Sequence, residues 1–86
     1  MYKLIYSTSA QKDAKKIAGS NLKIKCQKLL DIIAKNPHQN PPPSEKLVGD
    51  LHGCLSRRIN IQHHLVYEIF EKEKTIVVLR MWSHYE

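Results

Sequence analysis

The chain has 86 residues, of which 14 are Lys or Arg and eight are Asp or Glu, so its formal net charge is +6. A chain of this length builds one domain with a modest core, which excludes multidomain enzymes and large cofactor-binding folds. The positive charge favours a polyanionic partner, which could be nucleic acid, a ribosome, an acidic protein or an anionic membrane surface.

The cysteine content and hydropathy predict a cellular location. The two cysteines, Cys26 and Cys54, are too few for the disulfide framework of a small secreted domain, and neither lies in a metal-spaced pair. The first residues lack the hydrophobic region of a signal peptide, and no apolar run approaches the roughly 18 residues of a membrane span. We therefore expect one soluble, cytoplasmic domain over residues 1–86 with reduced thiols and no membrane partner.

The N-terminal half predicts a strand followed by two helices. Residues 3–6 are β-leaning, and the hydroxyls of residues 7–9 can cap a helix that runs to about Ala18 and stops at Gly19. A second helix should begin after residues 20–21, because apolar side chains recur along one of its faces. These side chains are Leu22, Cys26, Leu29, Leu30 and Ile33.

The C-terminal half predicts a sheet. Asn36-Pro37 should end the second helix, and the proline-rich segment up to Pro43 should deliver residues 44–47 to a defined place. After Gly53 we expect strands at 54–60, 63–70 and 75–82, joined by antiparallel hairpins. The predicted class is α+β, with the order β-α-α-β-β-β and a twisted, mainly antiparallel sheet that packs both N-terminal helices on one face.

Strand alternation separates the two adjacent arginines. Leu55, Arg57 and Ile59 should face the helices, so Arg58 should lie on the open face among polar or small neighbours. In the following strand, the same alternation places His64 on the face of Arg58. An arginine in such a setting is a candidate for holding a phosphate, and the alternative is an ordinary surface pair with a glutamate.

The charge is also divided along the chain. Residues 1–43 contain eight lysines and two acids, whereas residues 44–86 contain six basic and six acidic residues, including all three arginines. The lysine-rich half is expected to dock on ribosomal RNA or an acidic protein in a salt-sensitive way. The alternative is that these lysines are ordinary solvated positions on helix faces.

Four segments together resemble one protein family. They are Ser44-Glu45-Lys46-Leu47, residues 50–60 with their Ser-Arg-Arg-Ile-Asn sequence, His63-His64-Leu65-Val66-Tyr67, and residues 80–85 with a His-Tyr pair. This combination resembles the YoeB/Txe family of toxins in the RelE superfamily of type II toxin–antitoxin modules. The resemblance covers the whole chain and implies a RelE-like fold.

The resemblance implies a function and partners. It implies a toxin that enters the ribosomal A site, cleaves the messenger RNA there and inhibits translation. It also implies a co-encoded antitoxin of the YefM/Axe type, which should present acidic groups to this basic chain, and it leaves a homodimer open.

The same resemblance assigns roles to residues. Glu45 matches the general base, Arg58 the phosphate-binding arginine, His84 the general acid and Tyr85 the aromatic residue that orders the site. His64 stands where the family usually has a second arginine. A histidine carries only part of a charge near neutral pH and lacks the bidentate fork of arginine.

These residue types suit metal-free RNA cleavage. A base removes the proton of the 2′-hydroxyl, the 2′-oxygen attacks the adjacent phosphorus, and an acid protonates the departing 5′-oxygen. Glu45 would serve as the base if partial burial raised its pKa, and a histidine with a pKa of about 6.5 suits the acid. The reaction needs no cofactor, so it predicts a 2′,3′-cyclic phosphate product without added metal and no cleavage of DNA.

Other functions remain open at this point. The chain could be an attenuated or non-catalytic homologue that only binds the ribosome or antitoxin, because His64 replaces the arginine. It could instead be a gyrase inhibitor like the ParE toxins, which share the scaffold without these catalytic residues. A metal site at His63, His64 and His84 is a poor alternative, since adjacent residues on a strand point to opposite faces.

Overall fold

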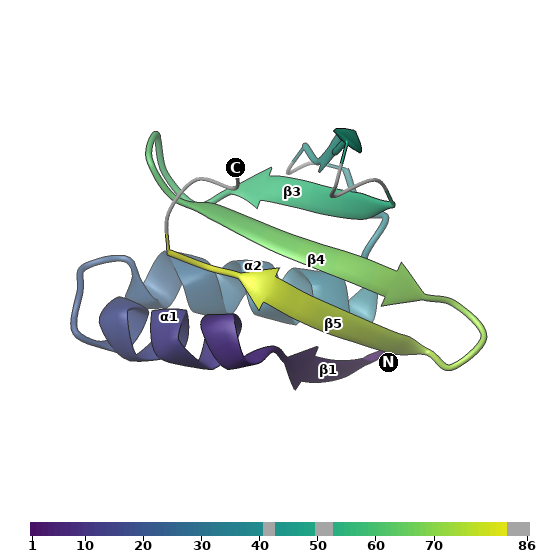
Figure 1. Cartoon of the computed structure of the whole chain (residues 1–86), viewed down its shortest axis with the longest axis horizontal. Helices are drawn as coiled ribbons and strands as arrows, with labels where there is room; N and C mark the ends of the chain where they lie inside the picture. The colour runs from purple at the N-terminus through teal and green to yellow at the C-terminus, as the bar shows by residue number, and fades with distance from the viewer. Residues whose placement is uncertain (41–42, 50–52, 83–86) are drawn as a thin grey trace.

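Two helices and five strands form within residues 1–40, 43–49 and 53–82, which are the residues that the computed structural model describes. In chain order they are β1 (Lys3–Tyr6), α1 (Thr8–Ala18), α2 (Lys23–Lys35), β2 (Glu45–Lys46), β3 (Cys54–Arg58), β4 (His64–Phe70) and β5 (Thr75–Arg80) (Figure 1). Neither helix is long and apolar enough to cross a membrane, a finding that covers the described residues alone.

The first helix begins and ends where the sequence predicts. The Ser7 hydroxyl accepts a hydrogen bond from the backbone N–H of Ala10 at 3.0 Å, which caps the N-terminus of α1. At the other end, the N–H of Gly19 donates to the Lys16 carbonyl at 3.2 Å. This hydrogen bond to Ser7 fixes the backbone turn between β1 and α1. The helix therefore runs back across the sheet.

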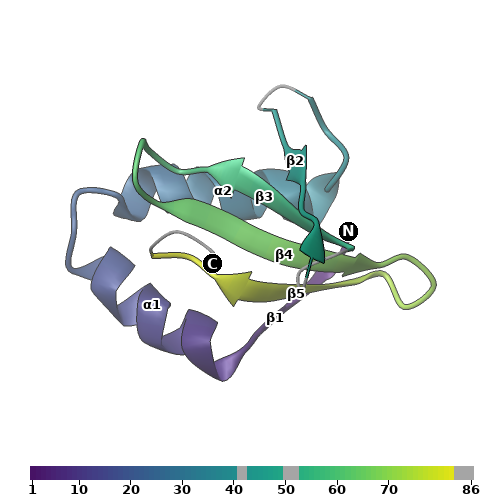
Figure 2. The ribbon, with the colours of Figure 1, turned by 45° about the horizontal axis from the view of Figure 1, so that its top comes forward.

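The strands form one mixed sheet in the order β1-β5-β4-β3-β2. β1 pairs with β5 in parallel, and all other pairs are antiparallel, as expected. Figure 2 shows β2 beside β3, at the opposite side of the sheet from β1. Within the described residues, β2 is therefore an edge strand that pairs only with β3.

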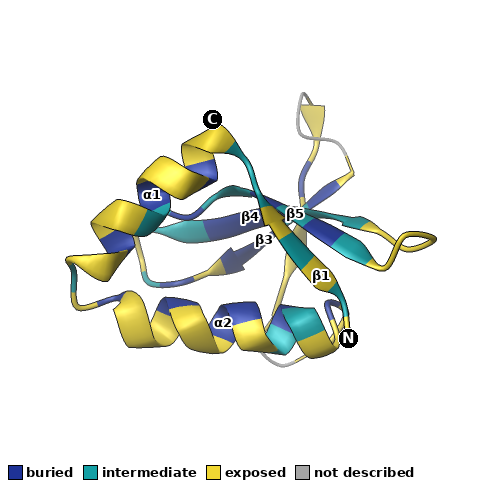
Figure 3. Ribbon diagram, turned by 90° about the horizontal axis from the view of Figure 1, so that it is seen from below, coloured by how far each residue is buried: buried dark blue, intermediate teal, exposed yellow. Residues whose placement is uncertain are grey.

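The main core lies between the sheet and the two helices. Buried side chains of α1 and α2 pack against the sheet face that carries Ile59, Leu65 and Tyr67. Figure 3 shows that buried positions recur along both helices. The predicted α2 stripe contributes all of its members to this core: Leu22, Cys26, Leu29, Leu30 and Ile33. A smaller cluster of Leu47, Cys54 and Val66 lies on the other face of the sheet, hereafter the open face.

Both cysteines are free and buried, one in each cluster. Burial raises the pKa of the Cys26 thiol, and burial together with the nearby Glu68 raises that of Cys54. Both side chains therefore remain protonated near neutral pH and act as small apolar groups in the core.

The predicted element boundaries need three corrections. The strand predicted at 54–60 ends at Arg58, because the Asn60 side chain accepts hydrogen bonds from the N–H groups of Gln62 and His63 and turns the chain. The next strand accordingly begins at His64, and the last one ends at Arg80. The sequence interpretation also missed β2, which is only two residues long and forms by pairing with β3.

Candidate active site on the open face

The open face of the sheet contains a pocket of about 320 Å³ at the β2 edge. Its lining consists of Pro43, Ser44, Glu45, Ser56, Arg58 and His64. Three of the residues predicted to act in chemistry, Glu45, Arg58 and His64, thus meet in one hollow. They come from three different strands, β2, β3 and β4.

Strand register brings these side chains together. Glu45 lies directly opposite Ser56 in the β2–β3 pair, and Arg58 lies opposite His64 in the β3–β4 pair. Ser56 and Arg58 are two residues apart, so the pleat points both to the same face. Directly opposed residues have Cβ atoms roughly 5 Å apart, which places a carboxylate, a guanidinium and an imidazole around one small volume.

Exposure varies sharply across the pocket. Arg58 and Glu45 are exposed, His64 is half-buried and Ser56 is buried. The condition set for Glu45, partial burial, is therefore not met in the isolated chain. The reason is that β2 is a two-residue edge strand, and no other strand among the described residues covers its outer side.

His84 and Tyr85 lie outside the described residues, so their predicted places in the site stay predictions. Hydrogen bonds and a ring stack fix residues 80–82, which precede them in the chain. Oδ2 of the buried Asp13 on α1 accepts hydrogen bonds from Arg80 Nε–H at 2.9 Å and from the Met81 N–H at 3.0 Å. Burial opposes the charge of Asp13, but these two donors outweigh it, and the pKa of Asp13 is lowered.

A ring stack fixes the next residue of this segment. The Trp82 indole stacks on the His63 imidazole, with 4.3 Å between the ring centroids and 26° between the planes. His63 is the immediate neighbour of His64, which lines the pocket. The last described residue before the terminal segment is therefore anchored near the pocket.

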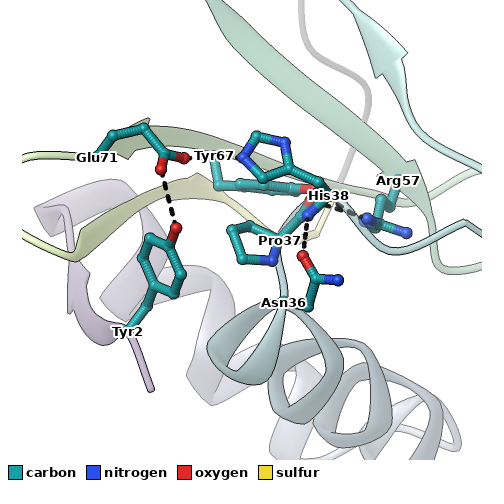
Figure 4. Close-up of polar contacts among 7 residues, drawn as sticks. All are labelled: Tyr2, Asn36, Pro37, His38, Arg57, Tyr67 and Glu71. Carbon is teal, nitrogen blue, oxygen red and sulfur yellow. Dashed lines mark hydrogen bonds and ion pairs between the residues drawn. The ribbon is translucent and has the colours of Figure 1, made fainter.

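The adjacent Arg57 has a different environment. Its side chain is 1% exposed and reaches the helix side of the sheet. Arg57 Nε donates to the Tyr67 hydroxyl at 2.8 Å, and Nη2 donates to the Pro37 carbonyl at 2.9 Å (Figure 4). Nη2 also donates to the Gln39 carbonyl at 2.8 Å. Arg57 thus fastens the start of the connector between α2 and β2, the connector that carries Glu45 to the pocket.

A wider hollow of about 850 Å³ adjoins the pocket and shares Pro43 and Arg58 with it. Among the residues that the structure describes, Lys25 of α2 and residues 59–62 complete its lining, and none of these side chains is acidic. Arg58 therefore lies between two hollows, with a second positive charge on one side. This arrangement favours an extended anionic ligand over a small neutral one.

Sequence reasoning identified Glu45, Arg58 and His64 but gave little weight to Ser56 and Lys25. Ser56 could have been found from alternation, since it shares a face with Arg58. Lys25 carries no such signal, because its position beside Arg58 depends on how α2 packs. Within the described ranges, no three His, Cys, Asp or Glu side chains gather as a potential metal site.

Comparisons with known proteins agree with this geometry. Residues 5–85 match the family model described as "YoeB-like toxin of bacterial type II toxin-antitoxin system". A relative named Toxin YoeB, from Synechocystis sp., is 37% identical over 76 residues, which span 88% of this chain and 79% of that protein.

Solved structures give the same result. A YoeB/ParE toxin from Agrobacterium tumefaciens superposes with a TM-score of 0.87 at 26% identity, covering 96% of this chain and 99% of that one. The YoeB–YefM complex from Staphylococcus aureus gives 0.82 at 31% identity, covering 99% of both chains. The YoeB dimer from the same organism gives 0.82 at 30% identity, covering 98% of both. With the family model matching nearly the whole chain, this protein belongs to the YoeB family of bacterial type II toxin–antitoxin toxins.

Proposed function

We propose that this toxin is a metal-independent endoribonuclease of the cytoplasm that cleaves messenger RNA in the ribosomal A site and so inhibits translation. The observation that carries the proposal is the open-face pocket, where Glu45, Arg58 and His64 line one hollow. This pocket contains a candidate base and a permanent positive charge, two of the three groups that the reaction requires. The third group, the acid, is assigned to His84.

The reaction can be written with named groups. Glu45 accepts the proton of the 2′-hydroxyl, and the 2′-oxygen attacks the adjacent phosphorus. The bond from phosphorus to the 5′-oxygen then breaks, and His84 gives that oxygen its proton. The products are a 2′,3′-cyclic phosphate and a free 5′-hydroxyl. Arg58 stabilises the negative charge that builds on the phosphate oxygens.

His64 and Tyr85 have supporting roles. His64 lies opposite Arg58 in the strand pair and can donate a hydrogen bond to the phosphate from the other side. Tyr85 follows the proposed acid directly in the chain and orders the terminal segment. The anchoring of Arg80, Met81 and Trp82 supports this assignment, because Trp82 stacks on His63, the neighbour of the pocket residue His64.

The exposure of Glu45 and Arg58 supports dependence on the ribosome. Charged groups in open water stabilise a transition state less than groups in a covered site, because water screens them. In the isolated chain this edge of the pocket is open. Messenger RNA held in the A site would cover the edge and complete the site.

The proposal includes two protein partners. The Staphylococcus aureus relatives are titled as a YoeB–YefM complex and a YoeB dimer. By this likeness, we expect a YefM-type antitoxin to bind this toxin and suppress it, and we expect the toxin to be able to pair with a second copy. The eight exposed lysines of the first half suit an acidic antitoxin segment as well as ribosomal RNA.

The experiment is primer extension on programmed ribosomes. Wild-type toxin should produce a new 5′ end within the A-site codon, and Glu45→Ala and His84→Ala should each lower the single-turnover rate at least a hundredfold. A supercoiling assay with gyrase is run in parallel. Loss of supercoiling with intact messenger would overturn the proposal in favour of a ParE-like activity.

His64 supports a second candidate, a toxin that binds ribosomes but cleaves slowly. A hydrogen bond from a charged donor is worth about 1 kcal/mol more than one from a neutral donor. We therefore expect His64→Arg to raise the single-turnover rate by roughly fivefold. An unchanged rate would show that histidine is an adequate substitute, whereas appearance of cleavage only in the variant would establish the non-catalytic form.

A further inference from the structure

The Ser56 hydroxyl is a buried polar group that the fold leaves unused. Ser56 is 3% exposed, and its Oγ atom has no hydrogen-bond partner among the residues that the structure describes. A buried hydroxyl that has lost its water and gained no partner is unfavourable for folding, and such groups are rare in native proteins. The position of this one therefore calls for a physical reason.

The neighbours of Ser56 do not give a structural reason. Its cross-strand partner on β4 is Val66, whose side chain cannot form hydrogen bonds, and its partner on β2 is Glu45. An alanine would fill the same volume at the sheet surface without the cost of an unpaired hydroxyl. The fold itself therefore gains nothing from the oxygen.

The pocket does explain why a hydroxyl stands at position 56. Ser56 lines the same hollow as Glu45, Arg58 and His64, and lies between the carboxylate on β2 and the guanidinium two residues along β3. A hydroxyl there is a buried neutral donor beside the charged guanidinium of Arg58. A ligand oxygen that enters the pocket would satisfy it.

We propose that the Ser56 hydroxyl donates a hydrogen bond to an oxygen of the phosphodiester group that Arg58 holds. This inference rests on the proposed function, since it places the scissile group in this pocket. Arg58 supplies charge, and Ser56 supplies a fixed donor whose position is set by two flanking strands. The contact strengthens as negative charge builds on the phosphate oxygens, so it acts mainly on the rate of the chemical step.

The test uses a graded series at one position and a matched control. Ser56→Ala removes the donor, and Ser56→Cys keeps a weaker donor of similar shape. The control is Ser7→Ala, because the Ser7 hydroxyl caps α1 and donates to the Leu79 carbonyl at 2.9 Å. Both alanine variants lose one oxygen, but only the control loses hydrogen bonds that the folded chain forms by itself.

Opposite outcomes are expected for the two serines. Ser56→Ala should lower the maximal single-turnover cleavage rate on programmed ribosomes by about ten- to hundredfold, while its thermal midpoint stays the same or rises. Ser56→Cys should fall between alanine and wild type. Ser7→Ala should lower the thermal midpoint and cleave at the wild-type rate below its transition.

A binding measurement separates failure of this inference from failure of the proposed function. A trinucleotide with 2′-deoxyribose at all three positions cannot be cleaved by attack of a 2′-oxygen, and its dissociation constant is measured by NMR titration. We expect Ser56→Ala to weaken binding about threefold or more, and Ser7→Ala to leave it unchanged. If the wild type does not cleave messenger but Ser56→Ala still weakens binding, the proposed function fails and the contact stands. If rate and affinity of Ser56→Ala both stay within twofold of wild type, the contact is refuted.

Discussion

Two adjacent arginines show how differently the two faces of the sheet use the same side chain. Arg57 points to the helix side, where it is buried and donates to Tyr67, Pro37 and Gln39. Arg58 points to the open face, where it is exposed and lines two hollows. The pleat alone separates them, so one arginine stabilises the fold while its neighbour remains available to a ligand.

The charged side chains also differ between the two faces of the sheet. On the helix side, the exposed lysines of α1 and α2 face solvent. An ion pair between Arg80 and Asp13 holds α1 against the end of β5. On the open face, opposite charges meet in a pocket of about 320 Å³. The helix side thus contributes stability and a basic surface, and we assign the proposed chemistry to the open face.

The largest expected effect is on the open face. Arg58→Gln removes the permanent charge from the pocket, and losing one such donor typically lowers the rate by about 100- to 1,000-fold. The unfolding free energy should change by less than about 0.5 kcal/mol, because the side chain is exposed. Single-turnover cleavage and urea unfolding measure the two quantities. A variant that cleaves normally would show that the open-face arginine is not part of the site.

Substitution of Arg57 should instead have its main effect on the free energy of unfolding. Arg57→Met keeps most of the buried volume but leaves the carbonyls of Pro37 and Gln39 without this donor, so we expect a loss of about 3 kcal/mol in unfolding free energy. Urea denaturation measures it. Arg58→Met is the matched control and should unfold like the wild type. Equal stability of the two variants would contradict the division between the faces.

Asp13 allows a pH test of the helix side. Its pKa is lowered in the folded chain, so its contribution to stability is present above the unfolded value of about 3.9 and is lost as pH falls through the folded value. We expect Asp13→Asn to cost about 2 kcal/mol at neutral pH, since Arg80 is 41% exposed and partly screened. The difference between variant and wild type should shrink below pH 4. A difference that stays constant down to pH 2 would exclude this linkage.

The smallest effects on the fold are expected on the lysine-bearing helix surface. Lys15→Gln and Lys16→Gln should each change the unfolding free energy by less than about 0.5 kcal/mol. Together they should weaken ribosome binding and lower the slope of log affinity against log salt by roughly one per lost phosphate contact. The maximal cleavage rate should not change. A fall in that rate at saturating ribosomes would assign these lysines to the chemistry instead.

The sequence predicted those features that depend on local pattern. The alternation in β3 and β4 correctly separated Arg57 from Arg58 and placed His64 beside Arg58, and the Ser7 cap and the α2 stripe were equally readable. The two-residue strand β2 was not, because two residues carry no periodicity. Its existence depends on pairing with β3, as does the exposure of Glu45.

The sequence also did not predict features that depend on tertiary packing. The groups that donate hydrogen bonds to Asp13 belong to residues almost 70 positions away. Arg57 can hold the connector only after β3, β4 and the residues that follow α2 have come together. The unpaired hydroxyl of Ser56 becomes visible only when every neighbour is known. Glu45, His84 and Tyr85 were singled out because of the family resemblance, and their roles stay predictions.

The central claim is that the open-face pocket directs a 2′-hydroxyl onto its own phosphate. The most direct measurement places a single 2′-deoxynucleotide at the mapped cleavage position of a messenger on programmed ribosomes. The fragments from the unmodified messenger are analysed by mass spectrometry. The account predicts 2′,3′-cyclic phosphate ends from the unmodified messenger and no cut at the deoxy position. Cleavage at the deoxy position would contradict it, because that nucleotide lacks the proposed nucleophile.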